Sequence, residues 1–124
     1  MSLCGFLAPD GVFTECDSWE HMQTAADISK EKYNKTFQHL YEAEDYLYEI
    51  GYVVFYARAV GYTGISRIGN RIILLSEAQK DFIITHLDKA NNKDQKKSME
   101  DLLKCNDDYQ EDSILNHYES NIKY

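Results

Sequence analysis

The spacing of apolar residues predicts two short strands at the start of the chain, over residues 3–8 and 12–16. The turn sequence Ala8-Pro9-Asp10-Gly11 separates them. Proline fixes φ at the first turn position, and glycine supplies the positive φ that closes a three-residue hairpin with a bulge. The pattern therefore predicts a β-hairpin with Ala8 opposite Val12, Phe6 opposite Thr14 and Cys4 opposite Cys16.

A first helix is expected directly after this hairpin. Asp17 or Ser18 would cap it, and Asp17 with Glu20 has the spacing of a capping box. Four apolar residues share one helical face and are expected to point inward: Trp19, Met22, Ala25 and Ala26.

A second helix is expected to end at Gly51, because glycine is favoured just beyond a helix C-terminus. Its apolar face consists of Leu40, Ala43, Leu47 and Ile50. Carboxylates occupy the other side, at Glu42, Glu44, Asp45 and Glu49. The same helix therefore has one face for a core and one for water or a partner.

The next stretch, residues 52–75, has the composition of strands. Residues 52–56 are β-branched or aromatic, and Gly69-Asn70 is a two-residue hairpin signal between residues 63–68 and 71–75. These signals predict a three-stranded antiparallel meander.

The C-terminal part of the chain predicts two or three helices. Ser76 and Gln79 form a capping box that opens a helix to about Asp88, and Asn91-Asn92 breaks the chain after it. Inward positions of this helix are Phe82, Ile83, His86 and Leu87, and a further helix contains Met99, Leu102 and Leu103. Residues 106–124 have helical spacing and are expected to dock loosely.

This order of elements predicts an α+β fold in one domain over residues 1–124, since it is neither alternating βαβ nor all-helical. Met1-Ser2-Leu3 is interpreted as an added leader without structural weight. One core is expected to contain Leu7, Phe13, Trp19, Met22, Leu47, Val54, Ile65, Leu74, Phe82, Ile83 and Leu87.

The charge and the cysteine content indicate which partners and which cellular compartment suit this chain. The chain has a net charge of -8, and residues 1–50 contain three lysines against ten carboxylates. Such a chain is a poor nonspecific binder of nucleic acid, and its acidic half suits a basic partner surface. Three cysteines, no signal peptide and no apolar run near the ~20 residues of a membrane span indicate a cytoplasmic protein.

The first candidate for chemistry is the set Cys4, Cys16 and His21. The hairpin register places the cysteines side by side, and His21 follows five residues after Cys16. These are zinc-ligand types, with Cys105 or His39 as a conceivable fourth ligand. No CxxC pair is present, and buried cysteine packs well as a small hydrophobe. The sequence therefore favours simple packing and predicts no bound metal and no cofactor.

Other signals for catalysis are weak. Cys4-Gly5-Phe6 resembles the start of class II glutamine amidotransferases, which begin with Cys-Gly. Cys4 would serve as a nucleophile of this kind only if the chain were cleaved directly before it. The chain is too short for the four-layer sandwich that this resemblance implies. The four histidines are scattered, at His21, His39, His86 and His117. We therefore assign no catalytic residue.

Two charged groups remain as candidate interaction surfaces. The acidic positions Glu42, Asp45 and Glu49 form either a solvated face or a stripe that docks on a basic protein. Arg58, Arg67 and Arg71 do not form one patch, because the predicted register sends Arg67 and Arg71 to opposite faces of the sheet.

The opening Cys4-Gly5-Phe6-x-x-Pro9-Asp10-Gly11-x-Phe13-x-x-Cys16-x4-His21 resembles the start of small proteins of phages, prophages and mobile elements in Gram-positive gut bacteria. Glu44-Asp45-Tyr46-Leu47-x3-Gly51-Tyr52-Val53 and Leu75-Ser76-Glu77-x-Gln79 fit the same resemblance. It implies an accessory protein and transfers no catalytic residue.

The leading hypothesis is a non-enzymatic acidic protein that binds and modulates another protein, as a phage or mobile-element factor would. One alternative is a metal- or thiol-dependent enzyme built on Cys4, Cys16 and His21. The other is a nucleic-acid-binding regulator.

Overall fold

The computed structural model describes residues 3–61, 75–104 and 106. Its strands form one antiparallel sheet in the order β2-β1-β3-β4, so the α+β prediction is confirmed. The strand bounds are Gly5–Leu7 (β1), Phe13–Glu15 (β2), Val53–Phe55 (β3) and Val60–Gly61 (β4).

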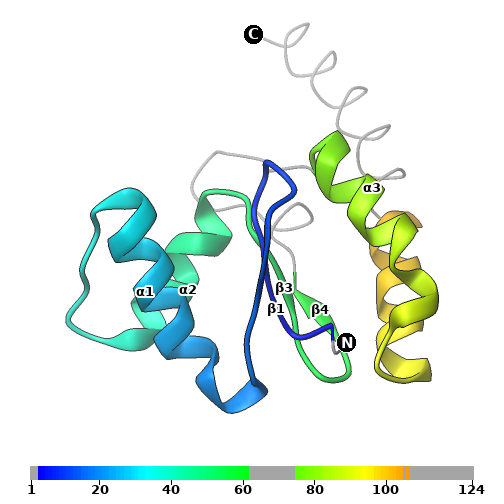
Figure 1. Cartoon of the computed structure of the whole chain (residues 1–124), viewed down its shortest axis with the longest axis horizontal. Coiled ribbons are helices and arrows are strands. Elements are labelled where there is room, and N and C mark those ends of the chain that lie inside the picture. Colours follow the sequence, from blue (N-terminus) through cyan, green and yellow to red (C-terminus); the bar gives the residue numbers. More distant parts are fainter. Residues whose placement is uncertain (1–2, 62–74, 105, 107–124) are drawn as a thin grey trace, which may run out of the picture.

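Helices cover both faces of this sheet (Figure 1). On one face lie α1 and α2, and on the other lie α3 and a further helix over residues 93–104. The described residues thus form three layers, with the sheet between two layers of helices. The helix bounds are Ser18–Glu20 (η1, a 3-10 turn), His21–Tyr33 (α1), Leu40–Glu49 (α2), Glu77–Thr85 (α3) and Leu87–Lys89 (η2, a 3-10 turn).

The hairpin has the register that the sequence predicts. Phe6 pairs with Thr14, the Ala8 N–H donates to the Val12 carbonyl at 2.9 Å, and the Cys16 N–H donates to the Cys4 carbonyl at 2.9 Å. Gly11 has φ +92°, the conformation that the turn chemistry requires. Turn residues thus determine where the two cysteines lie.

Alternation along β1 and β3 divides the apolar residues between two cores, so the prediction of one core is wrong. One cluster, beneath α3, contains Leu3, Leu7, Val53, Phe55, Leu75, Ile83, Met99 and Leu102. The other, beneath α1 and α2, contains Phe6, Ala8, Ala25, Ile28, Ala43, Leu47, Tyr52 and Val54. Successive side chains of a strand point to opposite faces, so a sheet covered on both sides supplies two cores.

The predicted inner face of the first helix is right for Ala25, which is buried, and wrong for Trp19 and Met22. Trp19 is 82% exposed and Met22 is 49% exposed. Residues 18–20 form a 3-10 turn before α1, so Trp19 does not share the helical phase that the spacing assumed. Asp17 makes no side-chain capping hydrogen bond, and the predicted capping box is absent. The buried face of α1 is instead His21, Ala25, Ile28 and Ser29.

The end of α2 agrees with the sequence. Gly51 has φ +101°, its N–H donates to the Tyr48 carbonyl, and the Tyr52 N–H donates to the Leu47 carbonyl. This pair of bonds is a Schellman motif. Ala43 and Leu47 are buried as expected, whereas Leu40 is exposed.

Two buried glutamines connect α3 and the helix of residues 93–104 to the two ends of the β1–β3 strand pair. Gln79, in the confirmed capping box with Ser76, donates to the carbonyls of Leu7 and Gly51. Gln95, whose N–H bonds the Asn92 side chain, donates to the carbonyls of Leu3 and Tyr56. The hydrogen bonds of Gln95 were not predicted, because the sequence identifies Asn91-Asn92 only as a break in the chain.

Three other predictions have partial outcomes. The first strand of the meander is present as β3, and it pairs with β4 over Val60–Gly61. The predicted strands 63–68 and 71–75, with the Gly69-Asn70 turn, lie outside the described residues except for Leu75, as do residues 107–124. The helix that Ser76 opens ends at Thr85, and a 3-10 turn continues to Lys89.

Candidate functional site

The fold brings Cys4, Cys16 and His21 together at one end of the hairpin. Cys4 directly precedes β1 and Cys16 directly follows β2, so the hairpin register places them opposite each other. His21 is the first residue of α1, and its side chain points inward. Three neighbouring elements therefore hold these side chains, each through backbone geometry set by local sequence.

The three side chains lie within the reach of one small ligand. The Cys4 Sγ is 3.2 Å from the His21 Nε2. The two sulfurs and a ring nitrogen of His21 all lie within 4.8 Å of one another. Cys4 and His21 are each only 5% exposed, while Cys16 is half-buried and both cysteines are free thiols.

Aromatic rings fix the orientation of the His21 imidazole. It stacks on Tyr56, with ring centroids 4.9 Å apart, and contacts Phe6 at 5.3 Å. Because Nε2 faces Cys4, Nδ1 lies on the other side of the ring. Nδ1 is buried, and it has no hydrogen-bond partner among the described residues.

A polar network continues from Tyr56 to α2. The Tyr56 hydroxyl donates to the Glu44 carboxylate and lies 2.9 Å from the Tyr48 hydroxyl. The sequence groups Glu44 with the solvated acidic face, but this carboxylate points toward the sheet and is half-buried. The alternation Tyr52, Val54, Tyr56 along one strand is the signal that places these rings on the α1–α2 side.

Burial keeps the cluster neutral. It raises the pKa of the Cys4 thiol, with the charge of Asp17 as the second cause, and raises the pKa of Cys16 to about 11. Burial also lowers the pKa of His21 below 6.5, against an opposing effect of Glu44. The pair is therefore a thiol and a neutral imidazole near pH 7, which is the reverse of an activated thiolate–imidazolium pair.

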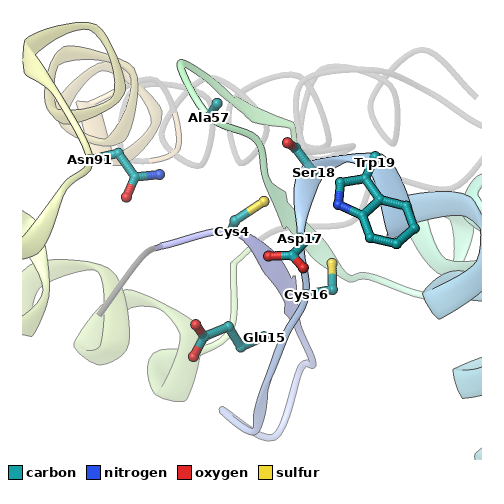
Figure 2. A pocket seen from close by; sticks show the side chains of 8 residues that line it. All are labelled: Cys4, Glu15, Cys16, Asp17, Ser18, Trp19, Ala57 and Asn91. Carbon is teal, nitrogen blue, oxygen red and sulfur yellow. The ribbon is translucent and has the colours of Figure 1, made fainter.

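A cavity of about 190 Å³ opens beside the cysteines (Figure 2). In that view the Asp17 carboxylate lies between Cys4 and Cys16, and the Trp19 indole stands at the rim. Trp19 is the most exposed of the large apolar side chains described. The walls are formed by Cys4, Glu15, Cys16, Asp17, Ser18, Trp19, Ala57 and Asn91.

The other predicted site residues lie apart from this cluster. His39 precedes α2 and stacks on Tyr41, so it is not a fourth member. The His86 Nδ1–H donates to the Phe82 carbonyl at 2.7 Å, and the imidazole stacks on the Phe82 ring at the half-buried end of α3. Cys105, His117, Arg67 and Arg71 lie outside the residues whose side chains are described.

The acidic stripe is divided by the structure. Asp45 and Glu49 are exposed on α2, whereas Glu42 is half-buried. Arg58 is exposed in the turn between β3 and β4. Whether these carboxylates contact a partner stays a prediction.

Leu3 has a structural role, so the interpretation of residues 1–3 as a leader without structural weight is wrong for Leu3. Its side chain is fully buried, and its carbonyl accepts from Gln95 at 2.6 Å. The Leu3 N–H donates to the Asn91 side chain. Leu3 is thus part of the core.

Comparison of the chain with protein-family models, with curated proteins and with solved structures finds no match. None of the helices in the described ranges has the length and apolar character needed to cross a membrane.

Proposed function

We propose that this chain is a non-enzymatic accessory protein that binds and modulates another protein, and that it docks on a basic surface of that partner. The cytoplasm, where free thiols persist, is the compartment that fits it. A phage or mobile-element factor that acts on a host protein is the setting in keeping with the resemblance of its opening.

The exposure of Trp19 is the observation that carries this proposal. A tryptophan that is 82% exposed costs solubility and contributes little to the fold, yet tryptophan is among the commonest anchors of protein interfaces. Glu15 and Asp17 line the same cavity as Trp19, and Glu20 lines a second cavity with them. An exposed aromatic anchor with carboxylates in the neighbouring cavity suits an apolar pocket in a basic surface.

The thiol-enzyme alternative is less well supported. Thiolate, not thiol, is the nucleophile, and burial raises the pKa of both cysteines while lowering the pKa of the neighbouring histidine. Nucleic-acid binding is disfavoured by the net charge of -8. The interaction hypothesis needs neither an activated group nor a basic patch.

Affinity capture from the native host, with wild type and Trp19→Ala compared side by side, tests the proposal. Proteins enriched only by wild type are then purified, and their affinity for both forms is measured. Loss of an interfacial tryptophan should weaken binding at least tenfold. Ile84→Ala is the matched control, because Ile84 is also exposed but lies on α3, across the sheet.

Equal binding of the purified partner to wild type and Trp19→Ala would show that the indole is not an anchor. The acidic stripe has its own test: Glu42→Lys, Asp45→Lys and Glu49→Lys together should slow association at low salt and lose that effect at high salt. Unchanged on-rates at low salt would identify the stripe as a solvated face.

A further inference from the structure

We propose that Cys4, Cys16 and His21 bind one zinc-type divalent cation, with the fourth coordination position facing the cavity beside Asp17. This site shares its cavity with Trp19 and the neighbouring carboxylates, and the proposal goes beyond the proposed function without resting on it. It reverses the expectation from the sequence, which favoured packing because no CxxC pair is present.

Distances support the site. Tetrahedral zinc has bonds of about 2.3 Å to sulfur and about 2.0–2.1 Å to nitrogen, which puts its ligand atoms about 3.5–3.8 Å apart. The Cys4 Sγ and the His21 Nε2 are already 3.2 Å apart, and all three ligand atoms lie within 4.8 Å of one another. An ion would therefore require side-chain adjustments of about 1 Å and no change of fold.

The ligands are held in place before any ion binds. The backbone bond from Cys16 to Cys4 fixes the two cysteine backbones opposite each other, and Tyr56 and Phe6 contact the imidazole ring on its faces. Nε2 is the ligand atom, because it is the ring nitrogen that faces Cys4. Preorganisation of this kind lowers the ordering cost of coordination.

The charge around the site favours a cation. Glu15, Asp17 and Glu20 surround the cysteines, and in the described part of the chain the one ion pair lies elsewhere, between Lys80 and Glu77. These carboxylates make the site negative, no lysine or arginine is among the described residues that line its cavities, and the two thiols release their protons when a metal binds. A divalent cation supplies the missing positive charge.

The donor set selects the kind of metal. Two sulfurs and one imidazole suit zinc and are poor ligands for magnesium or calcium, which prefer oxygen. Three protein ligands leave one position open. That position faces the cavity that Asp17 lines, where a water molecule completes the tetrahedron.

Cobalt(II) titration of the full chain, freed of metal by a chelator and kept reduced, tests the site directly. One equivalent should produce the thiolate-to-cobalt charge-transfer band and the visible bands of tetrahedral cobalt, and zinc should displace them. Cys16→Ser and His21→Gln should each weaken cobalt binding at least tenfold. His39→Gln, at an exposed histidine outside the cluster, should leave it unchanged.

Circular dichroism shows whether each variant folds, and Cys16→Ser is the main variant because Cys16 is only half-buried. Failure of the reduced, folded protein to give a tetrahedral cobalt spectrum would overturn the proposal. So would a spectrum that Cys16→Ser leaves intact, because the sulfur ligands would then lie elsewhere.

Discussion

Replacing Gln95 with methionine would remove three hydrogen bonds from a fully buried position while keeping the length of the side chain. The Gln95 Nε2 donates to the carbonyls of Leu3 and Tyr56, both at 2.6 Å, and its Oε1 accepts from the Asn91 N–H at 2.7 Å. These bonds attach the helix of residues 93–104 to the sheet beside Cys4. The variant therefore loosens the strand that carries a candidate ligand.

The expected loss of stability depends on which hydrogen bonds the former partners of Gln95 keep in the variant. A buried polar group left without a partner costs about 1–3 kcal/mol. The Leu3 carbonyl retains the Asn91 side chain at 3.4 Å, and Asn91 is exposed, so water can replace its lost bond. The Tyr56 carbonyl loses its only side-chain donor among the described contacts. We expect a total loss of about 2–4 kcal/mol, or roughly 10 °C in Tm.

Urea denaturation followed by circular dichroism measures this loss. Gln38→Met is the matched control, because Gln38 is exposed, and it should change the free energy of unfolding by less than about 0.5 kcal/mol. A loss below about 1 kcal/mol for Gln95→Met, with an unchanged m-value, would refute the view that these bonds hold the helix to the sheet.

Three further predictions concern stability. Trp19→Ala should cost less than about 0.5 kcal/mol, since the indole is exposed, whereas Phe82→Ala should cost about 2–4 kcal/mol; equal losses in denaturant melts would contradict the assigned exposures. Gly5→Ala would place a Cβ against the Thr14 carbonyl oxygen at φ +150°, so soluble expression should fall sharply; a normally folded variant would refute this close approach. Burial lowers the pKa of His21, so the unfolded chain takes up the proton first and stability should fall as the pH drops below about 6.5. His21→Gln should flatten that dependence between pH 7.5 and 5.5, and an identical pH profile would show that His21 does not contribute.

Local chemistry determined much of this protein in advance. The Pro9-Asp10-Gly11 turn sets the hairpin register, Gly51 ends α2, and Ser76 with Gln79 begins α3. Each of these features depends on residues only a few positions apart, so the sequence contains the whole interaction. The opposition of Cys4 and Cys16 follows from the same turn and was predictable for that reason.

Only the tertiary structure decided how distant elements meet. Pairing of β1 with β3 placed β1 in the interior of the sheet, and helices on both faces created two cores instead of one. The 3-10 turn before α1 rotated Trp19 into solvent and directed His21 toward the cysteines. Apolar spacing shows that a residue shares a face with its neighbours, but not which distant surface that face meets. The contact between the His21 imidazole and the Cys4 thiol belongs to this second kind, because it depends on how α1 packs against the sheet.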